Sequence, residues 1–141
     1  MVFTVDRSKW RSGGDGKNKI GIGATALLNP SGFMCCLGQT CNQLGVKKVD
    51  LVKLGEPSEI DSDKYKKFPD IFVDIEEDYS YDDEYPIELS FSNSKLSEDA
   101  MEINDDEDIS QKEREKRLRN LFKEHGHKIK FIGESRKRAK K

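Results

Sequence analysis

The chain has 141 residues, of which 34% are hydrophobic and 37% are charged, and its formal net charge at pH 7 is −2. This length fits one domain of ordinary size, and the low apolar content allows only a modest core. The longest uncharged stretch, residues 20–46, is interrupted by several glycines and by Pro30, which excludes a membrane-spanning segment.

The small net charge conceals three blocks of opposite sign. Residues 1–55 carry 8 basic and 3 acidic side chains, residues 56–108 carry 4 basic and 20 acidic ones, and residues 109–141 carry 13 basic and 4 acidic ones. The blocks therefore have charges of +5, −16 and +9. The net charge of the whole chain is therefore a misleading description of its surface.

The acidic block has three interpretations. It can be a solvated surface with mobile loops, an acidic surface that meets a basic partner or imitates a nucleic-acid backbone, or a site for divalent metals. Residues 104–108 lack the glycine and the alternating ligands of a calcium loop, so we expect no metal site there. The candidate binding residues in this block are Asp74, Glu76, Glu77, Asp78, Asp105, Asp106 and Glu107.

In chain order, the first expected element is a strand over residues 2–5, which are β-branched and aromatic. A glycine-rich loop over residues 13–23 follows, and then a short helical turn over residues 24–28. The next helix is predicted over residues 33–44, with Ser31 as its N-cap and Gly45 at its end.

The phase of this helix predicts different environments for its cysteines. At 100° per residue, Cys41 lies on the apolar face and Cys36 at its border. Cys35 points away from that face, beside Gln39 and Asn42, and we expect these three residues to be exposed and available for binding. Three clustered cysteines and the lack of a secretory signal favour free thiols in a cytoplasmic protein.

Residues 71–75 and 87–91 alternate in polarity and read as half-buried strands, with residues 76–86 between them as a mobile acidic loop. Ser97 is expected to cap a short helix. Ser110 and Glu113 form a capping box for a helix over 111–125, whose apolar stripe includes His125. A last strand is expected over 128–132, and 134–141 read as a disordered basic tail.

These elements predict an α+β fold with a small, mainly antiparallel sheet and helices packed on one face. The domain is expected to span residues 1–133.

Two groups of residues, the glycine loop and the cysteines with the two histidines, could in principle form a cofactor site or an active site. The glycine loop fails both the phosphate-loop and the dinucleotide patterns, so we expect no nucleotide cofactor. Cys35 in the first turn of its helix could be a nucleophile if His125 or His127 served as its base. A zinc site built from the remaining cysteines and the two histidines has unsuitable ligand spacing, so no metal is expected.

Trp10 and Arg11 follow the first strand and form a further candidate binding pair. An exposed tryptophan flanked by cations can anchor a partner or stack on a base. The alternative interpretation is that Trp10 covers the edge of the core.

Four short motifs stand out together: Trp10-Arg11 with Gly13-Gly14, Ala26-Leu27-Leu28-Asn29 with Gly32-Phe33-Met34-Cys35-Cys36-Leu37-Gly38, Gly55-Glu56-Pro57, and Ile103-Asn104-Asp105-Asp106 before the capped helix and the final strand. With them the sequence resembles a group of small uncharacterised proteins encoded by bacteriophages and bacteria. The resemblance covers most of residues 9–132. It implies the context of a phage or prophage accessory gene, and it carries no catalytic residue to this chain.

Our first hypothesis is a non-enzymatic phage-type accessory protein that binds a host protein or protein–nucleic-acid complex, as takeover or counter-defence factors do. Alternatives are a small enzyme or ligand-binding domain centred on Cys35 and the glycine loop, and a nucleic-acid-associated protein that uses the basic C-terminal segment. No membrane partner is expected.

Overall fold

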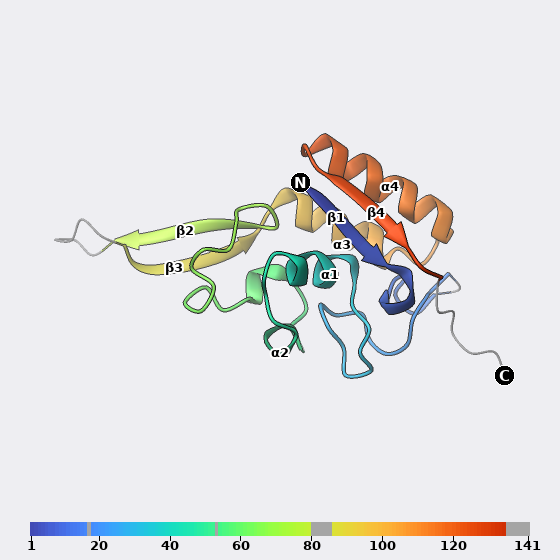
Figure 1. The fold of residues 1–141 in the computed structure, drawn as a ribbon, viewed down its shortest axis with the longest axis horizontal. Coiled ribbons are helices and arrows are strands. Elements are labelled where there is room, and N and C mark those ends of the chain that lie inside the picture. The colour runs from blue at the N-terminus through green and yellow to red at the C-terminus, as the bar shows by residue number, and fades with distance from the viewer. Residues whose placement is uncertain (17, 53, 80–85, 135–141) are drawn as a thin grey trace.

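The computed structural model describes residues 1–16, 18–52, 54–79 and 86–134. Figure 1 shows a body of helices and two strands from which a hairpin of two further strands extends. In chain order the elements are β1 (Val2–Asp6), η1 (Arg7–Lys9), α1 (Cys36–Gln43), α2 (Lys48–Leu51), η2 (Pro57–Glu59), β2 (Val73–Tyr79), β3 (Pro86–Asn93), α3 (Lys95–Asp105), α4 (Gln111–Glu124) and β4 (Lys128–Ile132).

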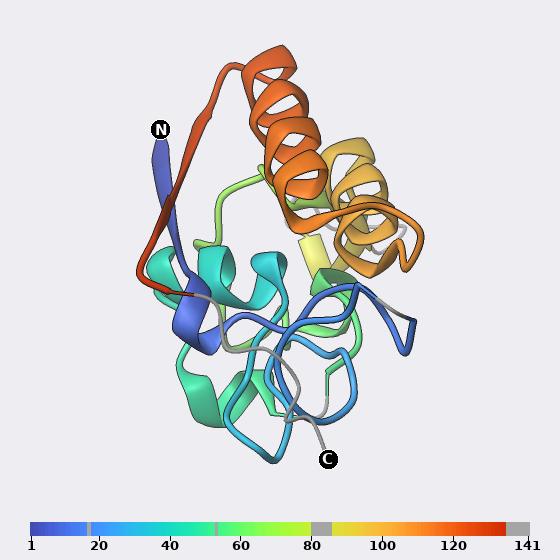
Figure 2. The same cartoon turned by 90° about the vertical axis from the view of Figure 1, so that its right-hand side faces the viewer.

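The predicted α+β class is confirmed, and the strands divide into two pairs in place of one sheet. β1 pairs with β4 in parallel, with Phe3 opposite Ile129, while β2 pairs with β3 antiparallel, with Ile75 opposite Phe91. The parallel pair joins the two ends of the described chain, and it lies beside α4 and α1 in both views (Figures 1 and 2).

Aromatic side chains hold the body together. The ring of Phe3 on β1 lies 5.2 Å from that of Phe72 and 5.8 Å from that of Phe122 on α4, in edge-to-face geometry. All three are at most 1% exposed. Edge-to-face aromatic pairs add stability beyond the apolar area they bury, so the N-terminal strand is fastened to the last helix.

Helix α1 begins three residues later than predicted. Oδ1 of Asn29 accepts hydrogen bonds from the backbone of Ser31 and Phe33, both at 3.0 Å, which folds residues 29–33 into a turn. Ser31 is therefore not the cap. Cys35 is the N-cap, and its Sγ accepts a hydrogen bond from the backbone of Gly38 at 3.4 Å.

Two other local predictions are wrong. Residues 24–28 form no helical turn, because the N–H of Leu27 bonds to the carbonyl of Leu54 at 2.9 Å. Helix α3 is capped by Ser94, whose Oγ accepts a hydrogen bond from the backbone of Ser97 at 3.2 Å. Ser97 itself lies inside the helix and is fully buried.

The C-terminal elements of the structure agree closely with the prediction. Ser110 caps α4 by accepting a hydrogen bond from the backbone of Glu113 at 3.1 Å, and β4 has the predicted bounds. Gly126 takes a φ of 81° at the turn after α4, as a helix stop requires. His125 is exposed, so its predicted place on the buried stripe is wrong.

The predicted acidic loop over 76–86 is shorter than expected, because β2 continues through Tyr79 and β3 starts at Pro86. Residues 80–85 lie outside the described residues, as does the basic tail from residue 135 onward. In the described ranges, no helix has the length and apolar character needed to cross a membrane.

Candidate functional site

Trp10 is part of the core. It is 0% exposed, and its indole stacks on the ring of Phe131 with the centroids 5.2 Å apart. The indole N–H donates a hydrogen bond to Oδ1 of Asn104 at 2.7 Å. Of the two interpretations of Trp10, the core one holds, and the partner-anchoring one is wrong.

Arg11 is buried as well, and it organises the glycine-rich loop. Its guanidinium donates to the carbonyls of Gly23 and Ser12 and to Oδ1 of Asp15, the last at 3.3 Å. The loop also docks on the end of α3, where the N–H of Gly13 bonds to the carbonyl of Asn104 at 2.7 Å. The glycines thus serve close packing, and Arg11 is not a free binding residue.

All three cysteines are buried, with exposed fractions of 4% or less, which corrects the prediction that Cys35 is exposed. Burial raises the pKa of the Cys35 thiol to about 12, and it raises the pKa values of Cys36 and Cys41 as well. The helical phase failed for Cys35 because this residue caps the helix from outside it. Its thiol is neutral at physiological pH, so it is not an activated nucleophile.

The two histidines do not join the cysteines. His125 is exposed at the C-terminal end of α4, and the ring of His127 packs against Phe3, with Nδ1 3.2 Å from the N-terminal nitrogen. Across the described ranges, no group of three or more His, Cys, Asp or Glu side chains is placed to hold a metal ion. Among the described residues, no hydrogen bond links a cysteine to either histidine.

Gln39 and Asn42 have structural roles that the sequence did not suggest. The amide of Gln39 accepts a hydrogen bond from the N–H of Asp6 at 2.7 Å and donates one to the carbonyl of the same residue at 3.0 Å. Asn42 is half-buried and donates to the carbonyl of Val46 at 3.0 Å. Neither side chain forms a free binding surface.

Asp105 is the last residue of α3, and Asp106 and Glu107 lie in the turn that follows it. The buried Arg114 holds this turn. Its guanidinium donates to the carbonyls of Ile103, Asp106 and Ile109. The carboxylate of Asp106 accepts a hydrogen bond from the backbone of Asp108 at 2.9 Å. The methylenes of Glu107 pack over Gly16. These acidic residues are partly committed to the fold.

The other acidic set, residues 74–78, lies on the β2–β3 hairpin, which extends away from the helices (Figure 1). Asp74, Glu76 and Glu77 are exposed there, and the side chain of Asp78 lies outside the described part of the structure. The hairpin therefore presents the predicted acidic residues at the periphery of the molecule.

One face of the hairpin carries carboxylates and hydroxyls. Because side chains alternate along a strand, Asp74 and Glu76 share a face. The antiparallel register places Ser92 opposite Asp74 and Ser90 opposite Glu76, and Glu88 continues the same face. Among the described residues, no ion pair involves Asp74, Glu76 or Glu88.

Side chains on the opposite face of the hairpin attach its base to the body of the molecule. Val73 is fully buried, and the ring of Phe91 lies 5.9 Å from that of Phe68 in the preceding loop. Oγ of Ser62 donates to the carbonyl of Leu89 at 2.7 Å. The sequence alone does not place Glu88, Ser90 and Ser92 on the acidic face, because that placement depends on the register of β2 and β3.

In comparisons with protein-family models, curated proteins and solved structures, no match is found.

Proposed function

We propose that this chain is a non-enzymatic binding protein that recognises a cationic surface of a host macromolecule through its acidic hairpin. The observation that carries the proposal is the face formed by Asp74, Glu76 and Glu88 on the projecting hairpin. The resemblance of its sequence phrases to small phage and bacterial proteins supports a role as an accessory factor in host takeover or counter-defence.

The electrostatics of the hairpin suit such a role. Residues two apart on a strand are separated by about 6.6–6.8 Å, so Asp74 and Glu76 form a row of charges that a basic groove can match. Ser92 and Ser90 lie opposite Asp74 and Glu76 on the neighbouring strand. Their small side chains leave the face accessible to a large partner and add hydroxyl groups that can form hydrogen bonds. Segregated charge of this kind steers association and raises its rate, and the effect falls as salt increases.

The enzyme alternative has less support. It requires an accessible Cys35 thiolate, whereas the thiol is buried and its pKa is raised to about 12. The glycine loop is occupied by the side chain of Arg11 and by the end of α3.

The test uses a charge-neutralised hairpin, with Asp74→Asn, Glu76→Gln and Glu88→Gln combined. The matched control neutralises three exposed helix carboxylates, Glu98→Gln, Glu102→Gln and Glu124→Gln. Both variants change the net charge equally. Immobilised wild-type protein and both variants are used to capture partners from lysate of a bacterial host, and the affinity of each captured partner is then measured with purified components.

We expect the hairpin variant to bind the partner at least about tenfold more weakly, because three exposed charge contacts are each worth up to about 1 kcal/mol. The helix variant should bind like the wild type. Equal binding by all three proteins would contradict recognition through the hairpin, and loss in both variants would show that only net charge matters.

A further inference from the structure

The two outer edges of the parallel β1–β4 pair differ in whether their backbone groups have hydrogen-bond partners. On the β1 side, the outward backbone groups belong to Val2, Thr4 and Asp6. The N–H of Thr4 bonds to Oε1 of Gln43 at 2.9 Å, and Nε2 of Gln43 donates to the carbonyl of Thr4. Gln39 binds both backbone groups of Asp6 in the same way. Two side-chain amides of α1 thus cover this edge at Thr4 and Asp6 as a neighbouring strand would.

The outer edge of β4 has no such cover. The N–H of Lys128 bonds to the carbonyl of Met1 at 2.9 Å, which turns the backbone groups of Lys128, and by alternation those of Lys130, toward β1. The N–H and C=O groups of Ile129 and Phe131 therefore point away from β1. Within the described ranges, no hydrogen bond reaches these two donors and two acceptors.

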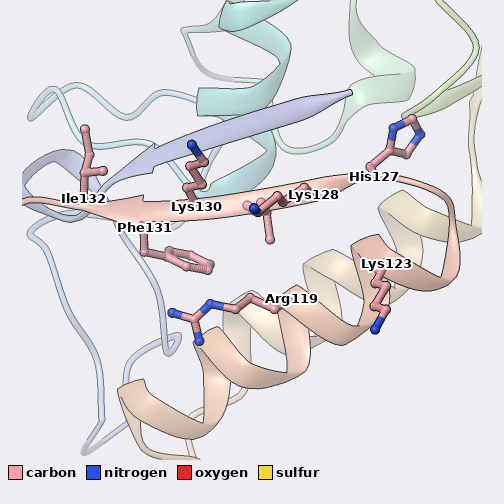
Figure 3. Close-up of a pocket in the computed structure, with 8 residues that line it drawn as sticks. Arg119, Lys123, His127, Lys128, Lys130, Phe131 and Ile132 are labelled. Carbon is pink, nitrogen blue, oxygen red and sulfur yellow. The ribbon is translucent and has the colours of Figure 1, made fainter.

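A groove of about 690 Å³ lies along this edge, between β4 and α4. Figure 3 shows Arg119 on α4 and Phe131 on β4 pointing toward one another, with the guanidinium carbon 5.2 Å from the ring centroid. On the other side of the strand, Lys130 and Ile132 project away from the helix (Figure 3).

The groove combines apolar surface with positive charge. Ile129 and Phe131 supply its apolar part on the side of the helix, and Ile132, which is 51% exposed, lines it from the other side of the strand. Among the described residues, its lining contains no acidic side chain but four cationic ones and a histidine, namely Arg119, Lys123, Lys128, Lys130 and His127. In the described part of the chain, the three lysines form no ion pair.

We propose that the β4 edge is a second binding site, which takes up an extended segment of a partner protein as an added strand. Unpaired backbone groups supply the hydrogen bonds in this mode of recognition, and pockets beside the edge select alternate side chains. The segment alternates apolar and acidic residues. Its apolar side chains face the groove with Ile129 and Phe131, while its acidic ones meet Lys128 and Lys130.

The positive charge of the groove favours an acidic partner segment over a second copy of this chain. A second copy of β4 would bring Lys128 and Lys130 against their own counterparts, which like-charge repulsion disfavours. A nucleic acid would match the lysines, but it would leave the backbone edge and the apolar side chains unused. The site lies in the body of the molecule, away from the acidic hairpin, so the two proposals stand independently.

The probe is a short, capped, fluorescent peptide that alternates glutamate and valine, and binding is followed by fluorescence anisotropy. Lys128→Glu combined with Lys130→Glu should weaken binding at least about tenfold. The matched control, Lys112→Glu combined with Lys116→Glu, makes the same change in charge on exposed positions of α4 outside the groove and should bind like the wild type.

Backbone pairing is tested separately from charge. We expect amide exchange at Ile129 and Phe131 to slow at least about tenfold when the peptide binds. The amides of Thr4 and Asp6, which are already bonded to glutamines, should keep their rates. Peptides N-methylated at all valines or at all glutamates remove alternate N–H groups, and one of the two should fail to bind.

Three results would overturn the proposal. The first is peptide binding that survives both N-methylations and leaves the exchange of Ile129 and Phe131 unchanged. The second is displacement of the peptide by an oligothymidylate that binds more tightly and does not slow those amides, which would assign the groove to nucleic acid. The third is self-association of the protein that the reversals of Lys128 and Lys130 abolish, which would assign it to a second copy.

Discussion

The indole N–H of Trp10 and the side-chain carbonyl of Asn104 form a buried hydrogen bond of 2.7 Å between residues 94 positions apart. The same oxygen accepts the backbone N–H of Cys36 at 3.1 Å, and Nδ2 of Asn104 donates to the carbonyl of Arg11 at 3.1 Å. One amide therefore joins the segment after β1, the first turn of α1 and the end of α3. Trp10 and Arg11, the Cys35–Cys36 pair and the end of α3 therefore meet at one buried point of the scaffold.

Asn104→Ala should destabilise the fold by about 2–4 kcal/mol, because it leaves the indole N–H and two backbone groups unpaired in the core. Urea unfolding monitored by the fluorescence of Trp10, the one tryptophan, measures this directly. Asn120→Ala, at an exposed position of α4, is the control and should change stability little. A loss below about 0.5 kcal/mol for Asn104→Ala would contradict the central role of this amide.

Arg114→Ala should cost about 3 kcal/mol or more, since the buried guanidinium satisfies three carbonyls in the turn between α3 and α4. Arg114→Lys should restore little of this, because an ammonium cannot reproduce the planar fork. Thermal unfolding of both variants provides the comparison. Full stability of the lysine variant would show that charge alone holds the turn.

All three cysteines should react slowly with iodoacetamide in the native protein, since burial keeps them as neutral thiols. Mass spectrometry should find fast labelling of Cys35, Cys36 and Cys41 only after denaturation. If Cys35 is labelled in the native protein as fast as in the denatured chain, its assigned burial is wrong.

Stability should fall on acidification in part through Glu115. Burial alone would raise the pKa of this carboxyl group, but hydrogen bonds from Arg7 and Gln111 outweigh burial and hold it below 4.5. Because the folded pKa is the lower one, ionised Glu115 stabilises the fold fully above the unfolded value, and this contribution disappears as pH falls through the folded pKa.

Glu115→Gln should therefore cost about 1–3 kcal/mol at pH 7, and the difference from the wild type should shrink once the pH is well below 4.5. Urea denaturation over a series of pH values measures both curves. A difference that stays constant down to acidic pH would mean that the charge of Glu115 is unimportant.

The sequence was a good guide where local signals act alone. The cap at Ser110, the stop at Gly126 and the strand over 128–132 depend on short-range patterns, and all three are confirmed. It was a poor guide where tertiary hydrogen bonds override a local pattern. Asn29 shifts the start of α1, and that shift buries Cys35.

For the candidate site, composition located the acidic segment and alternation assigned Asp74 to a strand. Glu76 was predicted in the loop that follows, whereas β2 continues through Tyr79. The contribution of Glu88 depends on the β2–β3 register, which the sequence does not specify. The uncovered edge of β4 depends on which strand Gln39 and Gln43 reach, and that is a consequence of how α1 packs.

The most direct test of the central claim is the salt dependence of partner binding. The dissociation constant of the wild type and of the Asp74→Asn, Glu76→Gln, Glu88→Gln variant is measured from about 0.05 M to about 0.3 M salt, over which the Debye length shrinks from about 14 Å to about 6 Å. If the acidic hairpin is the recognition surface, wild-type affinity falls steeply with salt and that of the variant is lower and nearly flat. Two parallel curves of equal affinity would contradict the account.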